Sequence, residues 1–242
     1  MFRSQSPTLA APTAVDSWRM FDRIAYRYDL LNRLLSFRRD IAWRKCLCAH
    51  LPERGNQRIL DLATGTGDVL LSVYRGSSKV VGGVGLDMSA NMLRFSRKKV
   101  ESAGLARDLT MMRSDACAIG SADASFDAAT MSFGIRNVPD VPRALREIRR
   151  ILRPGGRALI LEFSLPSNRV FRALYLLYFR HVLPFVGGLV SGNREAYRYL
   201  NSSVESFPYG EAFLELLREV GFSNVKALPL TMGIATLYLG DK

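Results

Sequence analysis

The sequence is poor in the residues that build metal sites and disulfide frameworks. Only three cysteines, Cys46, Cys48 and Cys117, and two histidines, His50 and His181, occur among its 242 residues. The cysteines lack the spacing of a zinc site, and their odd number is typical of reduced thiols in a cytosol-like compartment. We therefore expect neither a metal site nor a disulfide framework.

Long apolar runs are also missing. Residues 1–17 lack the apolar core of a secretory signal, and we interpret them as a flexible tail. The most apolar stretch, Val170 to Val190, is interrupted by residues such as Arg172 and Pro184, whereas a membrane span needs roughly twenty mostly apolar residues. Three interpretations of this stretch stay open: a cap over an apolar substrate, an amphipathic segment at a membrane surface, or an ordinary core helix.

Acidic residues are the minority among the charged side chains. The chain has 34 Lys and Arg against 22 Asp and Glu, which gives a formal net charge of +12. This excess favours a polyanionic neighbour, either nucleic acid or an anionic membrane surface, although arginines that merely coat helices give the same count. The length and the 48% hydrophobic content indicate one globular domain, which we place at residues 18–242.

The most informative stretch is Ile59-Leu60-Asp61-Leu62-Ala63-Thr64-Gly65-Thr66-Gly67-Asp68. Apolar residues lead into it and a helical pattern begins at Val69, as where a buried parallel strand turns into a helix whose N-terminus faces a ligand. Gly65 and Gly67 allow the backbone to turn tightly and to approach that ligand closely.

Several kinds of loop share this outline. A dinucleotide-binding loop requires a third glycine where Leu70 stands, and a P-loop requires a lysine, which this stretch lacks. The pattern resembles the acid-x-Gly-x-Gly-x-Gly loop of S-adenosylmethionine-dependent methyltransferases at Asp61, Gly65 and Gly67, with Ala63 in place of the first glycine. A plain strand-to-helix turn also remains open from this stretch alone.

Two further acids follow the next two expected strands. Asp87 ends an apolar run twenty residues beyond Gly67, where an acid in doubly wound folds accepts hydrogen bonds from ribose hydroxyls. The alternative for Asp87 is to cap the helix that begins near Ser89. Asp115 follows a short strand at 109–113, and we expect it to accept a hydrogen bond from an adenine amine.

Strand and helix patterns alternate from residue 58 to residue 163, which predicts a doubly wound α/β fold with a parallel sheet. Its fifth strand is expected at 158–163, and two closing strands at 224–230 and 234–239 complete seven. We interpret the short helices over 18–52 as a lid and the helical insertion over 164–207 as a substrate cap.

The exit of the fourth strand, Ser132 to Val138, is polar around one arginine. In an open α/β sheet the ligand lies beyond the carboxyl ends of the strands, so this segment belongs to the predicted site. It contains neither the Asn/Asp-Pro-Pro-aromatic motif of enzymes that methylate base amino groups nor a cysteine for pyrimidine C5 chemistry.

At these residues the chain resembles the ubiquinone/menaquinone biosynthesis C-methyltransferase family. The resemblance extends from about Phe21 to Gly240, with motifs in the same order: Phe21-Asp22-x-Ile24-Ala25-x-x-Tyr28-Asp29, the glycine loop, Gly85-Leu86-Asp87-Met88-Ser89, Ser132 to Val138, Leu161-Glu162-Phe163-Ser164, Leu183-Pro184, Ala196-Tyr197-x-Tyr199-Leu200 and Leu230-Thr231-x-Gly233-Ile234. It implies a seven-stranded class I methyltransferase fold that binds S-adenosylmethionine. The donor-binding positions are then expected at Asp61, Gly65, Thr66, Gly67, Asp87, Met88, Asp115, Ala116 and Ser132.

The resemblance also implies the reaction, which is methyl transfer to a ring carbon of a prenylated quinol such as demethylmenaquinol. A quinol that loses a hydroxyl proton concentrates negative charge on the adjacent ring carbon, and that carbon attacks the methyl group in line. We expect Arg136 to stabilise the phenolate, Asn137 to orient the second hydroxyl and Tyr197 to assist proton transfer. The structural alternatives are an ion pair for Arg136, a helix cap for Asn137 and packing for Tyr197.

A polyprenyl substrate resides in the bilayer, so we expect a cytoplasmic protein on the inner face of an anionic membrane, with no nucleic acid partner. A homodimer and a benzoquinol acceptor stay open. Two other classes of function remain as alternatives. An RNA methyltransferase is favoured by the net charge, and a non-catalytic donor-binding subunit is favoured by Ala63 and by Tyr238, which replaces a histidine common in the family.

Overall fold

The computed structural model describes residues 17–185 and 194–242. The tail expected at 1–17 therefore lies outside the described residues except for Ser17, and so does the end of the apolar stretch, from Val186 to Val190.

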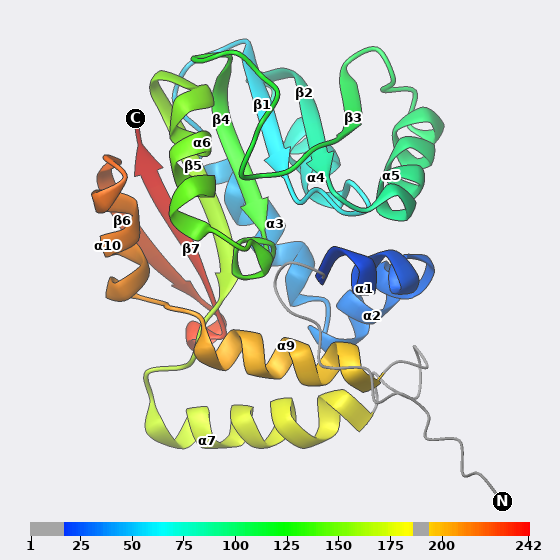
Figure 1. Ribbon diagram of the computed structural model, residues 1–242, viewed down its shortest axis with the longest axis vertical. Coiled ribbons are helices and arrows are strands. Elements are labelled where there is room, and N and C mark those ends of the chain that lie inside the picture. Colours follow the sequence, from blue (N-terminus) through cyan, green and yellow to red (C-terminus); the bar gives the residue numbers. More distant parts are fainter. Residues whose placement is uncertain (1–16, 186–193) are drawn as a thin grey trace, which may run out of the picture.

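Seven strands form one sheet in the order β3-β2-β1-β4-β5-β7-β6 (Figure 1). Strands β1 to β5 pair in parallel, and β7 is antiparallel to both β5 and β6. The predicted doubly wound α/β fold is confirmed, with the strand order reversing between β1 and β4. The bounds are β1 (Gln57–Leu62), β2 (Val80–Asp87), β3 (Leu109–Arg113), β4 (Phe126–Ser132), β5 (Leu152–Phe163), β6 (Ser223–Leu230) and β7 (Ala235–Asp241).

Strand β5 starts earlier than the expected residue 158. Its pairing with β4 jumps from Phe126↔Leu152 to Ala128↔Arg157, so the Pro154-Gly155-Gly156 segment forms a bulge within the strand. Gly155 has φ 73°, a left-handed conformation that glycine adopts readily. The Pro154-Gly155-Gly156 sequence, which is typical of a helix end, thus lies within β5.

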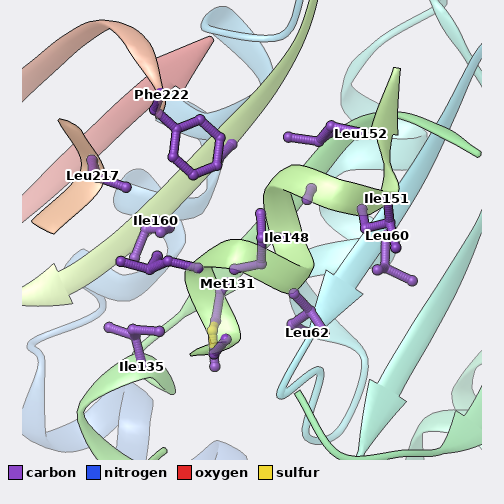
Figure 2. Close-up of a cluster of buried hydrophobic side chains, with 14 of the residues drawn as sticks. Leu60, Leu62, Met131, Ile135, Ile148, Ile151, Leu152, Ile160, Leu217 and Phe222 are labelled. Atoms are coloured by element: carbon purple, nitrogen blue, oxygen red, sulfur yellow. The ribbon is translucent and has the colours of Figure 1, made fainter. Parts of the chain in front are cut away.

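Side chains that alternate along β1 divide the core into two clusters. Leu60 and Leu62 pack with α6 (Val141–Ile151) and α10 (Glu211–Glu219) on one face of the sheet, as Figure 2 shows in part. Ile59 belongs to the cluster on the other face, with α3 (Arg39–Ala49), α4 (Asp68–Gly76) and α5 (Ala90–Ser102). Burial on both faces explains the nearly continuous apolar sequence of these strands.

The first two N-terminal helices, α1 (Ser17–Ile24) and α2 (Tyr28–Leu35), lie beyond the carboxyl ends of β1 to β4 (Figure 1), and α3 continues from them onto one face of the sheet. The N-terminal region comprises α1, a 3-10 turn (Ala25–Arg27), α2 and α3, over the range expected to be helical. Helices α1 and α2 therefore cover the end of the sheet at which a ligand is expected.

The helical insertion after β5 is confirmed as well. It contains α7 (Arg169–Leu177), a π-helical turn (Tyr178–Val182) and α9 (Arg194–Ser206), with α7 and α9 side by side (Figure 1). Inward-facing side chains such as Tyr175 and Phe179 form a third apolar cluster with Met20 of α1. Among the described residues, no helix combines the length and the apolar character needed to cross a membrane.

Candidate active site

The glycine loop joins β1 to α4 where the strand order reverses. Ala63, Gly65 and Gly67 all have positive φ angles, of 49°, 55° and 82°. Such a conformation is unfavourable for alanine, so Ala63 holds backbone strain where the expected pattern has glycine. Gly134 makes room for this alanine, because a Cβ at Gly134 would lie 2.6 Å from the Ala63 Cβ.

Asp61 lies beneath the loop and is only 1% exposed. Its Oδ2 accepts a hydrogen bond from Thr64 Oγ1 and its Oδ1 one from Thr130 Oγ1, each at 2.6 Å. One carboxylate oxygen thus holds the loop and the other holds β4, so the side chain of Asp61 connects the two. This geometry fits a residue that positions the loop, whereas direct contact of Asp61 with a donor stays a prediction.

The pKa of Asp61 gives the stability of the protein a pH dependence. Burial raises this pKa from 3.8 to about 6, so the folded chain retains a proton that the unfolded chain has released. The free energy of unfolding is therefore expected to fall by on the order of 3 kcal/mol as pH rises from 3.8 to about 6, and to stay lowered above it.

The substitution Asp61→Asn removes this titration. The free energy of unfolding of Asp61→Asn, relative to that of the natural sequence, is therefore expected to increase as pH rises from 3.8 to about 6. Urea unfolding of both proteins at a series of pH values that spans this interval measures the difference. A difference that does not change with pH would contradict the assigned pKa.

Asp87 brings the end of β2 against the glycine loop. Its Oδ2 accepts a hydrogen bond from the Gly65 N–H and its Oδ1 one from the Ser89 N–H, both at 2.8 Å. Burial raises the pKa of Asp87, and these backbone donors oppose the shift. The cap of α5 is instead Ser89, whose hydroxyl accepts from the Met92 N–H, so the capping alternative for Asp87 is wrong.

The other predicted donor-binding residues lie at the same end of the sheet. Met88 follows Asp87, and its carbonyl accepts a hydrogen bond from Arg113 Nε. Asp115 is exposed beside Ala116, and its Oδ1 accepts from the Cys117 N–H. The Ser132 hydroxyl is buried and has no hydrogen-bond partner among the described residues. An unpartnered buried hydroxyl is unfavourable, so Ser132 fits a position that contacts a bound molecule.

Two aspartates that were not singled out individually fasten the N-terminal helices to this region. Asp29 Oδ1 accepts a hydrogen bond from Thr66 Oγ1 at 2.6 Å, and Asp29 Oδ2 pairs with Lys99. Asp22 accepts from Ser89 Oγ and from the N–H of Asn91. In the sequence, these contacts were indicated only by the motif from Phe21 to Asp29, which carries Asp22 near its start and Asp29 at its end.

An apolar cavity of about 500 Å³ lies between the N-terminal helices, the exits of β4 and β5, and the insertion after β5. The rings of Trp43, Phe133 and Phe163 form one wall, with the centroids of the last two 4.4 Å apart. Of the described residues that line it, none is a predicted donor-binding residue. The two regions adjoin along the segment after β4, where Ser132 is followed by the cavity residues Phe133 and Arg136.

Arg136 is buried and lines this cavity. Its Nη1 donates to Glu162 Oε1 and to the Phe133 carbonyl, each at 2.7 Å, and the guanidinium lies 5.4 Å from the centroid of the Phe163 ring. The ion pair considered as a structural alternative is thus present. Arg136 Nε nevertheless has no hydrogen-bond partner within the described chain, so one buried donor remains for a ligand.

Asn137 and Tyr199 form a second polar pair near the cavity. The Tyr199 hydroxyl donates to Asn137 Oδ1 at 3.0 Å, and Asn137 Nδ2 donates to the Phe133 carbonyl at 3.4 Å. Asn137 does not cap the following helix, because the N-cap of α6 is Asp140. The third catalytic candidate, Tyr197, belongs to α9, but its side chain lies outside the described residues.

Of the four arginines on α6, Arg143 and Arg146 are exposed, and the other two are bound within the protein. Arg149 Nε donates to the Gly221 carbonyl, and Arg150 pairs with Glu147 and Asp123. These pairings weaken the argument from charge for a nucleic acid partner. No group of three or more His, Cys, Asp and Glu side chains within the described ranges is arranged to hold a metal ion.

Comparison with known proteins identifies the family. The model of the ubiE/COQ5 methyltransferase family matches residues 13–242. The chain belongs to this family. Relatives within it include a demethylmenaquinone methyltransferase from Thermus thermophilus, 47% identical over 92% of this chain and 100% of the relative. A ubiquinone/menaquinone biosynthesis C-methyltransferase UbiE from Geotalea uraniireducens is 47% identical over 92% of this chain and 94% of the relative.

Solved structures agree on the fold of this ubiE/COQ5 methyltransferase. The [4+2]-cyclase SpnF superposes with a TM-score of 0.70 at 18% identity, covering 96% of this chain and 97% of the other. A methyltransferase from Thermotoga maritima gives 0.66 at 20% identity, covering 93% and 99%. At these identities the likeness concerns the fold alone, and it supports the class I methyltransferase architecture expected from the sequence.

Proposed function

We propose that this methyltransferase moves a methyl group from S-adenosylmethionine to a ring carbon of a prenylated quinol, with demethylmenaquinol as the preferred acceptor. The observation that carries the proposal is the apolar cavity in which Arg136 retains an unpartnered Nε beside the glycine loop. The relative from Thermus thermophilus is named for demethylmenaquinone and that from Geotalea uraniireducens for both quinone pathways, which supports this acceptor class.

The residues at the glycine loop fit the donor. Gly65 and Gly67 leave the backbone without side chains at the turn, and Asp87 offers carboxylate oxygens to ribose hydroxyls. The unpartnered hydroxyl of Ser132 and the acid Asp115 offer further polar contacts. S-adenosylmethionine, when bound, supplies a methyl group activated by its positively charged sulfur.

The cavity fits the acceptor ring. Trp43, Phe133 and Phe163 offer flat aromatic contacts, and Arg136 Nε is available to a ring oxygen. Because the walls are apolar, the guanidinium acts on a developing phenolate more strongly than it would in water. Glu162 holds the guanidinium in place, so little reorganisation is needed when the ring oxygen loses its proton.

The outer face of α7 supports a membrane surface as the second partner. Val170, Leu174 and Leu177 recur at helical spacing and are 72%, 61% and 59% exposed. Arg169 lies beside them and is exposed to solvent, where it favours anionic lipid, whereas the exposed Arg180 is paired with Glu205. Leu174 also lines the cavity, so a polyprenyl tail that leaves the cavity along α7 would reach the lipid directly.

We expect the double substitution Val170→Glu/Leu177→Glu to abolish co-sedimentation with liposomes that contain anionic lipid, because it places two charges on the face that enters the bilayer. Neither residue lines the cavity, so methylation of a short-tailed quinol in detergent is expected to be unchanged. The matched control is Met112→Glu on β3, where an exposed apolar residue lies away from α7. Membrane binding by the double variant equal to that of the control would contradict this surface.

The proposed function is tested with labelled S-adenosylmethionine and three acceptors: reduced demethylmenaquinol, a demethylated benzoquinol and total RNA. We expect label in the naphthoquinol, and label in the benzoquinol alone would move the acceptor to the ubiquinone pathway. Label in RNA would support the nucleic acid alternative, and tight donor binding without turnover would support a non-catalytic subunit. Tyr238 no longer favours that last alternative, since it is a core residue whose hydroxyl accepts from the Gly210 N–H.

A further inference from the structure

Tyr175 is the residue of α7 whose polar group is least explained by the protein itself. Its side chain is only 8% exposed and stacks on Phe179, with ring centroids 5.2 Å apart and an interplanar angle of 23°. Tyr175 lines the cavity, and its hydroxyl has no hydrogen-bond partner within residues 17–185 and 194–242. Leu177 on the same helix is 59% exposed and does not line the cavity, whereas the buried Tyr175 does, so Tyr175 belongs to the inner side of the helix.

A buried hydroxyl without a partner needs a physical reason. Phenylalanine would fill the same space and make the same ring contacts without burying a polar atom, and native structures leave few such atoms unpaired. Polar groups that converge on an otherwise apolar pocket usually orient its ligand. The Tyr175 hydroxyl therefore indicates a polar atom of a bound molecule at this point of the cavity.

The positive charge of Arg136 acts on the hydroxyl of Tyr175 across the cavity that both residues line. Burial raises the pKa of Tyr175, and the positive charge of Arg136 acts on the same hydroxyl in the opposite direction. The phenol therefore remains protonated at neutral pH and can both donate and accept a hydrogen bond. Three buried polar atoms of described cavity residues thus lack a hydrogen bond: Arg136 Nε, Tyr175 Oη and Asp40 Oδ2. Asp40 Oδ2 lies 2.9 Å from Arg44 in an ion pair, which leaves Arg136 Nε from the turn after β4 and Tyr175 Oη from α7 as the two of them without any partner.

We propose that the Tyr175 hydroxyl binds the second ring oxygen of the quinol, the one that Arg136 does not bind. This inference rests on the proposed function, because two oxygens on opposite sides of one ring are what define a quinol. Asn137 was the residue expected to orient that oxygen, but its amide is engaged by Tyr199 and Phe133. Tyr175 and Arg136 together fix the rotation of the ring in its plane, and so they select the carbon presented for methylation.

The test compares Tyr175→Phe with the natural sequence on two reduced acceptors of equal tail length. One acceptor carries both ring hydroxyls, and the other lacks the hydroxyl remote from the methylated carbon. With the complete quinol, we expect KM to rise about 10-fold in Tyr175→Phe, as for loss of one hydrogen bond to a buried ligand atom. With the acceptor that lacks the hydroxyl, the two proteins are expected to have the same KM, because the bond is already absent.

Tyr178→Phe is the matched control, since it removes a hydroxyl from another cavity residue of the same helical segment. It is expected to give the same KM change, if any, on both acceptors. The thermal midpoint of Tyr175→Phe is expected to equal or exceed that of the natural sequence, because the variant buries no unpartnered hydroxyl.

The outcomes separate this inference from the proposed function. If the natural protein methylates the quinol and Tyr175→Phe shows an unchanged KM, or the same loss on both acceptors, the role of Tyr175 is overturned while the function stands. If the natural protein methylates neither acceptor, the proposed function is overturned, and the role of Tyr175 with it.

Discussion

Replacing Arg136 by lysine is expected to lower kcat by about 10²- to 10³-fold while the affinity for S-adenosylmethionine stays unchanged. A lysine keeps the charge, but it cannot hold Glu162 and the Phe133 carbonyl and still present a directed N–H to the ring oxygen. Steady-state kinetics with the reduced quinol and calorimetry with the donor measure the two quantities. A loss confined to donor binding would contradict the role of Arg136 in acceptor chemistry.

Because Arg136 forms a buried ion pair with Glu162, a second variant is needed to separate loss of stability from loss of activity. Arg136→Ala alone leaves a carboxylate that is 1% exposed without its partner, which is expected to destabilise the fold by about 3–5 kcal/mol. The double substitution Arg136→Met/Glu162→Gln removes both charges, so we expect it to recover most of that stability and none of the activity. Activity in the double variant within about 3-fold of the natural sequence would show that the guanidinium has no part in the reaction.

Gly67→Ala is expected to weaken donor binding by about 10- to 100-fold, because a small displacement of the loop disrupts several contacts at once. Gly67 has φ 82°, and a Cβ there would lie 3.0 Å from the Ser96 Cβ of α5, so either the loop or the helix must move. Calorimetric titration with S-adenosylmethionine measures the effect.

Gly104→Ala is the matched control for Gly67→Ala. Gly104 has φ 72°, yet an added Cβ would meet no atom within 4 Å. Both substitutions are expected to destabilise the fold by about 1–2 kcal/mol through their left-handed backbone, but only Gly67→Ala is expected to lose donor affinity. Equal donor affinity in the two variants would mean that the loop at Gly67 does not contact the donor.

The sheet was predictable because its signals are local. Apolar runs that are followed by the glycine loop, by Asp87 and by Asp115 mark three strands, and a parallel sheet necessarily gathers those strand ends at one edge. The bulge that starts β5 at Leu152 was not predictable, because a Pro-Gly-Gly sequence reads equally well as a break between elements.

The site was predictable only in part. The sequence indicated Arg136 through its segment, but its pairing with Glu162 joins two strand exits that only the register of β4 and β5 brings together. The sequence did not indicate a role for Tyr175, because a tyrosine in a helix rich in aromatic residues is expected to pack in the core. Its unpartnered hydroxyl became informative once the cavity was visible, and Tyr197, the tyrosine chosen from the motif, remains a prediction.

In the proposed reaction, the cavity presents a quinol carbon, activated by a phenolate at Arg136, to the donor beside the glycine loop. The most direct measurement is the position of an isotopically labelled methyl group in the product, determined by NMR after incubation with the reduced and with the oxidised acceptor. We predict label on the ring carbon adjacent to a ring oxygen, from the reduced acceptor only. Label on an oxygen, or equal transfer to the oxidised acceptor, would contradict this mechanism.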